Sequence, residues 1–159
     1  MRKFSFLVVI ALIMSACGGS ETGNLVDTDL TIFSMPINIM APAEFNHEHM
    51  DGEINTLMIE KDSSYNLTIE KISVGELDKD LATVMTNAKE LVEADAYFDS
   101  YVKEDDAGFI YKIDVDGTEG YDFQYFRIMG GTKYTFKGTL GVFHTKENVE
   151  MMYKAIQPK

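Results

Sequence analysis

The strongest constraint on the fold is a series of short alternating segments in the second half of the chain. In one of them, apolar residues take every second position: Phe109, Tyr111, Ile113 and Val115. Successive side chains of a strand point to opposite faces, so this pattern predicts a strand with one mainly apolar face. Residues 121–129 and 133–140 predict two more strands. Gly130-Gly131 between them predicts a tight hairpin turn with positive φ.

The rest of the chain adds further strands and two helices. Residues 30–40 predict an edge strand broken at Pro36, and residues 97–103 another strand. Residues 56–60 and 65–74 predict a hairpin, whereas residues 41–55 are polar and predict irregular structure.

Both helices are predicted from apolar residues at helical spacing. The first is expected to start with Asp78 as its cap and to end near Ala94. Its expected buried residues are Leu81, Val84, Met85, Ala88, Leu91 and Val92. The second is expected to start at Thr145 and to bury Val149, Met152, Tyr153 and Ile156.

Hairpin-linked strands with two inserted helices favour an α+β fold with an antiparallel sheet, because parallel strands need a crossover between them. We therefore predict a twisted antiparallel sheet of about six to eight strands with two main helices packed on it. The alternative is a curved sheet like that of cystatins or of the nuclear transport factor family, which the C-terminal helix fits less well.

The first twenty residues have the layout of an export signal. Arg2 and Lys3 precede an apolar stretch, residues 4–14, that is interrupted only by Ser5. This stretch is shorter than the roughly 20 apolar residues of a membrane-spanning helix, and small residues follow it.

Met14-Ser15-Ala16-Cys17 resembles the bacterial lipobox, although leucine is more usual where Met14 stands. The resemblance implies cleavage after Ala16 and a lipid anchor on Cys17, which would make the membrane a binding partner. Cys17 is the only cysteine, so the chain can form no internal disulfide and offers no other thiol nucleophile.

These signals divide the chain into residues 1–16, a signal peptide, residues 17–29, a lipidated flexible tether, and residues 30–159, a single α+β domain. The signal carries two of the 14 basic residues and none of the 26 acidic ones, so the rest has a formal charge of 12 − 26 = −14. Such a charge argues against nucleic acid as a partner. It suits a solvated acidic surface, and an envelope protein remains a candidate partner.

The second half also resembles PsbP-like domains. The residues that carry this resemblance are Gly108–Tyr111, Tyr121–Phe126, Tyr134–Gly138 and Thr145–Met152. The resemblance implies an α/β/α sandwich and a non-enzymatic binding or assembly role. It transfers no functional residue, because the basic contact residues of the photosynthetic members have no recognisable counterpart in this sequence.

The sequence predicts no catalytic residue, because it contains none of the local signatures of a serine hydrolase, a P-loop enzyme or a zinc protease. One candidate metal site stands out. His47 and His49 would point to the same side of an extended chain and could begin a Zn²⁺ or Cu²⁺ site, with a third ligand from Asp51, Glu53 or elsewhere in the chain. The alternative to a metal site is a polar segment with two exposed histidines that bind nothing.

The main hypothesis is therefore a non-catalytic binding or assembly module tethered to the bacterial cell envelope, with no cofactor assigned. Metal binding or sensing through His47 and His49 and an enzyme of unrecognised class are the alternatives. Gly18 stands directly after Cys17, where some bacteria place an aspartate that retains lipoproteins in the inner membrane. This favours the outer membrane over the inner one.

The lipobox resemblance gives a direct prediction. Mass spectrometry of the protein extracted from membranes should find Cys17 as the first residue and carrying acyl chains. A Cys17→Ala variant should lack both the lipid and stable membrane attachment, because stable anchoring needs two or more acyl chains. Recovery of an unmodified Cys17 thiol from the wild-type protein would contradict this interpretation.

Overall fold

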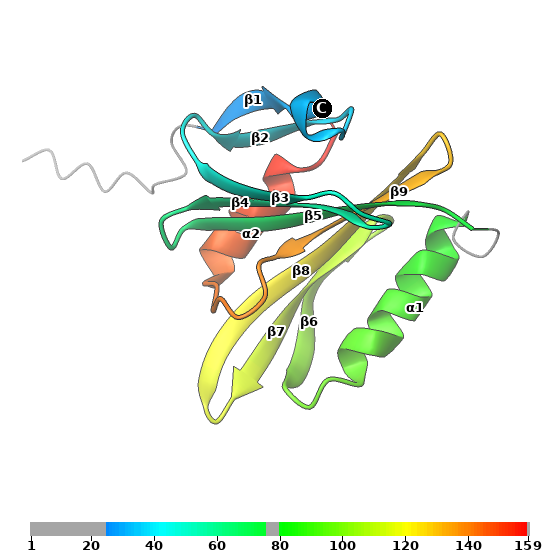
Figure 1. Cartoon of the computed structure of the whole chain (residues 1–159). Coiled ribbons are helices and arrows are strands. Elements are labelled where there is room, and N and C mark those ends of the chain that lie inside the picture. The colour runs from blue at the N-terminus through cyan, green and yellow to red at the C-terminus, as the bar shows by residue number, and fades with distance from the viewer. Residues whose placement is uncertain (1–24, 76–79, 159) are drawn as a thin grey trace, which may run out of the picture.

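The computed structural model describes residues 25–75 and 80–158. Over these residues it contains nine strands, two α-helices and one 3-10 helix (Figure 1). In chain order they are β1 (Leu25–Asp29), η1 (Thr31–Phe33), β2 (Asn38–Pro42), β3 (Asn46–Met50), β4 (Asn55–Lys61), β5 (Tyr65–Ser73), α1 (Leu81–Glu93), β6 (Phe98–Asp105), β7 (Gly108–Val115), β8 (Thr118–Met129), β9 (Thr132–Gly138) and α2 (Lys146–Ala155). The predicted α+β class is confirmed.

Seven strands form one antiparallel sheet in the order β3-β4-β5-β9-β8-β7-β6, and β1 pairs with β2 separately. The predicted hairpin between β8 and β9 is confirmed, with Met129 opposite Thr132. Gly130 and Gly131 at its turn have φ values of +56° and +75°. Glycine adopts these values without the steric cost that a side chain would add.

The two helices lie on opposite faces of the sheet. Residues on the two faces of β8 pack in different cores, one with each helix. Phe123 and Tyr125 belong to a core shared with α2, whereas Phe126 packs in a second core with α1. The larger core also includes residues of β4, β5 and the segment around β1 and β2. Its fully buried members include Leu30, Met35, Ile59, Leu67, Ile69, Phe136, Val149, Met152 and Ile156.

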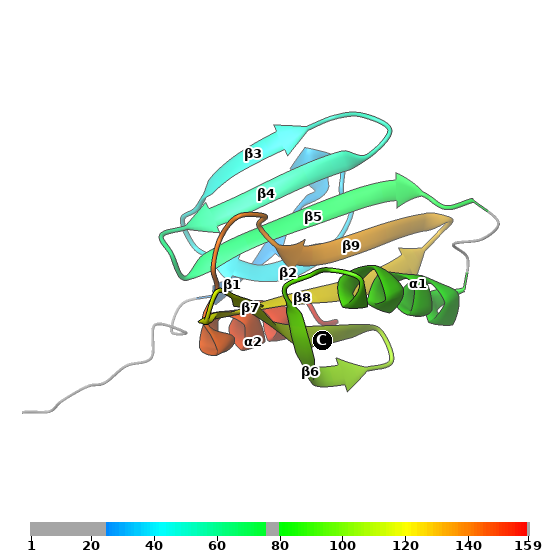
Figure 2. The ribbon, with the colours of Figure 1, turned by 90° about the horizontal axis from the view of Figure 1, so that it is seen from below.

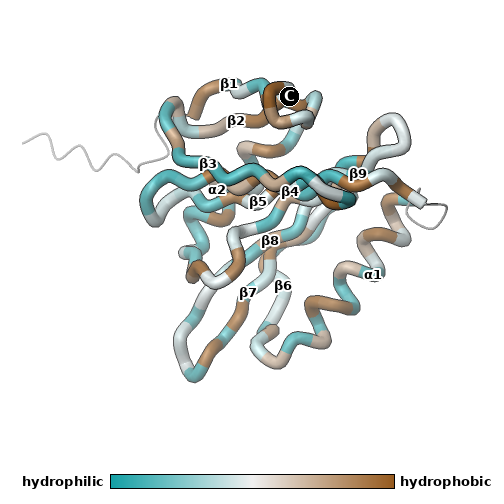
Figure 3. The backbone as a smooth tube through the Cα atoms, in the orientation of Figure 1, coloured by the Kyte–Doolittle hydropathy of each residue, from teal (hydrophilic) through white to brown (hydrophobic). Residues whose placement is uncertain are grey.

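Helix α1 covers only part of its face of the sheet. In Figure 2 it lies beside β8 and β9, and no described helix lies in front of β3, β4 and β5. The tube in Figure 3 is hydrophilic along much of β3 and β4, whereas α1 alternates between hydrophilic and hydrophobic residues. The smaller core therefore lies under α1 at the end of the sheet formed by β6, β7 and β8.

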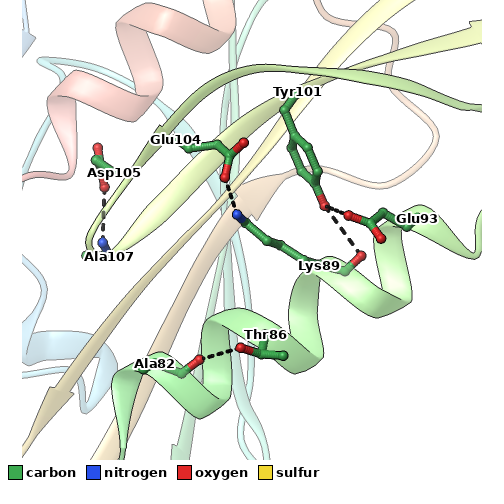
Figure 4. A network of polar contacts seen from close by, with 8 residues as sticks. All are labelled: Ala82, Thr86, Lys89, Glu93, Tyr101, Glu104, Asp105 and Ala107. Atoms are coloured by element: carbon green, nitrogen blue, oxygen red, sulfur yellow. Dashed lines mark hydrogen bonds and ion pairs between the residues drawn. The ribbon is translucent and has the colours of Figure 1, made fainter.

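Polar contacts join α1 to β6 (Figure 4). The Lys89 ammonium pairs with the Glu104 carboxylate and lies 5.1 Å from the centre of the Tyr101 ring. The Tyr101 hydroxyl donates to Glu93 Oε1 at 3.1 Å. Each exposed ion pair adds little stability by itself, so these contacts mainly orient the helix along the strand.

The start of α1 differs from the prediction. Its N-cap is Asp80, whose carboxylate accepts hydrogen bonds from the backbone N–H groups of Ala82 and Thr83. Asp78 lies outside the described residues. Leu91 was expected to be buried, but its side chain is 75% exposed, because it stands at the margin of the packed stripe beside the uncovered part of the sheet.

The N-terminal part of the domain also needs correction. Residues 25–29, expected in the flexible tether, form β1, which pairs with β2 from Leu25 opposite Pro42 to Asp29 opposite Asn38. Residues 30–40 are not one strand. Leu30 and Met35 turn into the core around η1, and the chain becomes extended again only at Asn38.

Residues 41–55 are likewise more ordered than expected, because they contain the edge strand β3. Its backbone pairs with β4 from Asn46 opposite Glu60 to Met50 opposite Thr56. None of the five residues of β3 is buried, so hydrophobic alternation, the usual local signal for a strand, is absent. The opposite edge strand, β6, is interrupted by two register shifts, one between Phe98 and Ser100 and one between Tyr101 and Lys103.

The packing of α1 can be tested at two adjacent aliphatic residues. Val92→Ala should lower the free energy of unfolding by about 2 kcal/mol, because it removes buried methyl groups and leaves a cavity. Leu91→Ala should change it by less than about 0.5 kcal/mol, since that side chain lies mostly in solvent. Urea unfolding of the two variants measures the difference, and equal losses would contradict the observed face of α1.

Candidate functional site

A groove of about 370 Å³ lies where β8 meets the β1–β2 pair and the end of α2. The described residues that line it are Asp27, Pro36, Ile37, Asn38, Ile39, Met40, Arg127, Met129, Ala155, Gln157 and Pro158. Most of these residues are apolar. The size is within the range of pockets that bind small organic molecules, about 300–1,000 Å³.

Arg127 supplies the positive charge of this groove. It is the only arginine outside the first sixteen residues of the chain. Its position on β8 places it on the same face as Phe123 and Tyr125, toward α2 and the β1–β2 pair. The guanidinium carbon lies 5.2 Å from the centre of the Phe136 ring, a distance at which a cation interacts favourably with an aromatic face.

The guanidinium is incompletely paired. Its Nε and Nη2 atoms are buried and have no hydrogen-bond partner within residues 25–75 and 80–158. Burial lowers the pKa of Arg127, and Tyr125 partly opposes this effect. The group nevertheless remains charged at neutral pH, because the ordinary pKa of arginine is far above neutrality.

These two nitrogens lie on the same edge of the planar guanidinium. The N–H of Nε and one N–H of Nη2 point in the same direction along one edge of the guanidinium. This edge matches the spacing of two oxygens of a carboxylate or phosphate and can bind them through two parallel hydrogen bonds. Both atoms are shielded from bulk water, so the guanidinium would have to turn toward the groove to meet an anion.

The other polar residues of the groove are better satisfied. Asp27 accepts a hydrogen bond from Asn38 Nδ2 at 2.7 Å. The carboxamide of Gln157 is at the end of the groove next to Pro158. The described lining thus combines one cation, the Asp27 carboxylate held by Asn38, carboxamides and apolar walls, an arrangement suited to binding and orienting a ligand.

The sequence reasoning missed Arg127. Two signals were present: a single arginine in an acidic domain, and its position within the aromatic run from Tyr125 to Ile128. Neither signal shows that the guanidinium lacks a carboxylate partner, because that depends on which strands and helices surround it. The aromatic residues Phe123, Tyr125, Tyr134 and Phe136 of β8 and β9 are buried in the sheet core, and Tyr121 is partly buried.

The predicted metal residues lie elsewhere, on edge strand β3. His47 and His49 occupy alternate positions, so they share the face toward Phe33, whose ring centre is 4.9 Å and 5.6 Å from theirs. His49 Nε2 lies 3.0 Å from Asn55 Oδ1 and 3.4 Å from Asp51 Oδ1. Within the described part of the chain no group of three or more His, Cys, Asp or Glu side chains could hold a metal ion. Zinc or copper binding stays a prediction.

A second hollow, of about 280 Å³, borders α1 and β9. Its two lysines are Lys133 and Lys137, and the Lys137 ammonium lies 2.7 Å from Glu70 Oε1. Lys137 is therefore already neutralised by a carboxylate, in contrast to Arg127. The hollow offers a weaker case for a charged ligand.

A buried polar cluster joins β7, β8, β9 and the start of α2. Asp122 Oδ1 accepts the backbone N–H groups of Phe123 and Gly138, at 2.7 Å and 2.9 Å, and Tyr111 donates to Oδ2 at 3.2 Å. His144 is 2% exposed, and neither ring nitrogen has a partner among the described residues. A Cβ on Gly138 would lie 2.5 Å from Asp122 Oδ1 and 2.8 Å from His144 Nε2, so only glycine fits.

The pKa values of the two ionisable residues of this cluster, His144 and Asp122, are shifted in opposite directions. Burial lowers the pKa of His144, although the Asp122 charge opposes this effect. Burial raises the pKa of Asp122, against its hydrogen bonds and the charge of His144. Neither of the two grooves described above includes these side chains among its lining residues, so the cluster is best explained as a structural junction.

The His144 shift predicts a pH dependence of stability. An unfolded histidine takes up a proton near pH 6.5 whereas folded His144 resists it, so acidification through that value favours unfolding. Between about pH 7.5 and 5.5 the wild-type protein should lose on the order of 1 kcal/mol more of its free energy of unfolding than His144→Asn does.

Asp122 contributes with the opposite sign, because its raised pKa favours the folded protein at low pH and the benefit is lost as pH rises. The control is therefore Asp122→Asn, which removes the second titration and should retain the loss caused by His144. Thermal or urea unfolding across this pH range measures both effects. Equal pH slopes for the wild type and His144→Asn would contradict the shift.

Among the described residues, no helix is long and apolar enough to cross a membrane. Cys17 lies outside the described residues, so lipidation stays a prediction. No family model matches the chain, and a search of curated proteins finds no match either.

Proposed function

We propose that the protein is a lipid-anchored, non-catalytic binding module of the bacterial cell envelope, and that the groove at Arg127 is its ligand site. The lipobox at residues 14–17 supports the anchor. The absence of local catalytic signatures from the sequence supports a binding role over an enzymatic one. The position of Gly18 favours the outer membrane.

The incomplete pairing of Arg127 carries the ligand-binding part of this proposal. A buried charge without a partner costs several kcal/mol, so such charges are normally paired with an opposite charge. The chain contains 26 acidic residues and Asp27 lines the same groove, yet no described carboxylate accepts a hydrogen bond from Nε or Nη2 of this guanidinium. An anionic ligand would supply the missing charge and occupy both nitrogens.

The lining indicates the chemistry of that ligand. An oxyanion would bind the guanidinium, and the walls formed by Pro36, Ile37, Ile39 and Met40 favour an apolar body attached to it. A volume of about 370 Å³ limits the ligand to a small molecule. The proposed class is therefore a small organic anion, such as an aryl or alkyl carboxylate.

A titration of the full-length protein in nanodiscs with 3-phenylpropionate tests the proposal. The protein should bind this carboxylate, and Arg127→Gln should weaken binding by at least about tenfold, since hydrogen bonds to a charged group contribute roughly 1.5–3 kcal/mol. Calorimetry or chemical shift changes of residues around the groove measure the affinity.

Two controls make the result specific. The alcohol 3-phenylpropanol has the same carbon skeleton without the charge and should bind much more weakly. Lys103→Gln removes a cation outside the groove and should leave the affinity for the carboxylate unchanged. If the alcohol binds as tightly as the acid, or if Arg127→Gln keeps the affinity of the wild type, the groove is not an anion site.

A further inference from the structure

The loop between β9 and α2 exposes two large apolar side chains. Leu140 is 97% exposed and Phe143 is 54% exposed, so both side chains face solvent rather than a core. Residues 138–145 contain no Asp, Glu, Lys or Arg, whereas charged residues make up 25% of the whole chain. The tip of this loop is thus unusually apolar for the surface of an acidic protein.

The loop has a defined conformation that presents these side chains. The Val142 N–H donates to the Thr139 carbonyl at 3.3 Å, and Gly141 has a φ of +82°, a value that suits glycine at the third position of a tight turn. The Thr139 N–H donates to the Asn66 carbonyl at 3.0 Å and ties the loop to β5. Leu140 therefore stands at the tip of a turn that is fixed at its base.

Phe143 is held on one side. Its ring lies over Gly120, where an added Cβ would come within 2.9 Å of Phe143 Cδ1. The next residue, His144, is buried and its backbone carbonyl accepts the Tyr121 N–H at 3.1 Å. The fold thus supports one face of the Phe143 ring and leaves the other in solvent.

This loop lies at the end of the domain where the tether enters. Leu25 pairs with Pro42, and three residues separate the end of β2 from the start of β3, where Asn46 lies opposite Glu60. Glu60 pairs in turn with Asn66, the residue that accepts the hydrogen bond from the loop. Figure 1 shows the start of β1 and the loop between β9 and α2 at the same side of the domain.

The length of the tether keeps this end close to the membrane. Seven residues, 18–24, separate Cys17 from the first residue of β1. Even a fully extended chain of this length spans no more than about 25 Å. The end of the domain that carries Leu25 and the loop therefore stays within reach of any bilayer that holds the lipid of Cys17.

We propose that Leu140 and Phe143 insert into the interfacial region of the bilayer that anchors Cys17, and so fix the orientation of the domain on the membrane. This inference rests on the proposed lipid anchor. The partner is a lipid surface contacted through apolar side chains. The acidic charge of the domain disfavours contact through anionic headgroups.

The absence of tryptophan from the chain gives a clean experiment, because one introduced tryptophan is the only one present. The full-length lipidated protein carrying Leu140→Trp is reconstituted into phosphatidylcholine vesicles with or without brominated acyl chains. Its emission should shift to shorter wavelength in the bilayer and lose intensity with the brominated lipid. Phe143→Trp, a change between aromatic residues, serves as a second reporter.

Ile32→Trp is the matched control. Ile32 is also aliphatic and 83% exposed. It lies in η1, which follows Asp29 at the end of β1 opposite to Leu25. Its emission should stay at the long wavelength of a solvated indole and should not respond to bromine. Quenching at Ile32 in place of Leu140, or the same solvated emission from all three reporters, would overturn the inference.

Mass spectrometry of the same samples separates this inference from the proposed function. If Cys17 carries acyl chains and Leu140→Trp remains solvated, the loop does not insert while the proposed anchor stands. If Cys17 is an unmodified thiol, the proposed anchor is wrong and the inference is overturned with it.

Discussion

The fold depends on the burial of both faces of β8. Phe123 and Tyr125 on one face form a core with α2, and Phe126 on the other face forms a core with α1. Because these residues are neighbours in one strand, a shift of register by one position would exchange the two cores and place each side chain under the wrong helix. The pairing of β8 with both β7 and β9 prevents this shift.

The same strand explains why the candidate ligand site is where it is. Arg127 follows Phe126 and therefore shares the face of Phe123 and Tyr125, but it lies at the end of α2, where the covering layer stops. A cation at this position can reach an apolar groove, whereas two residues earlier it would be enclosed in the core. The ring of Phe136 beside the guanidinium partly compensates for the missing carboxylate.

The parts of the fold that could be predicted from the sequence are those with a local cause. Gly130-Gly131 predicted the β8–β9 turn, because the turn requires positive φ, and Thr145 predicted the start of α2 through its hydroxyl, which accepts the N–H of Asn148.

The strand β3 was missed because it is held in place by pairing with β4, and its own residues carry no local strand signal. The exposure of Leu91 was missed for a similar reason. Helical spacing predicts which residues of α1 form its apolar stripe. How much of that stripe is buried depends on the area of sheet beneath α1, which the sequence of the helix does not specify. The incomplete pairing of Arg127 likewise depends on residues far away in the sequence.

The two edge strands gain a further meaning if the protein is attached to a membrane. Anchored molecules move in two dimensions with similar orientations, so open sheet edges would meet repeatedly and could pair into polymers. The register shifts in β6 break the regular row of backbone groups that such pairing requires, and its Lys103, Glu104 and Asp105 add charge. At the other edge, β3 is only five residues long and carries Glu48 between two histidines. Both edges would let the protein be crowded on a surface and still remain a single copy.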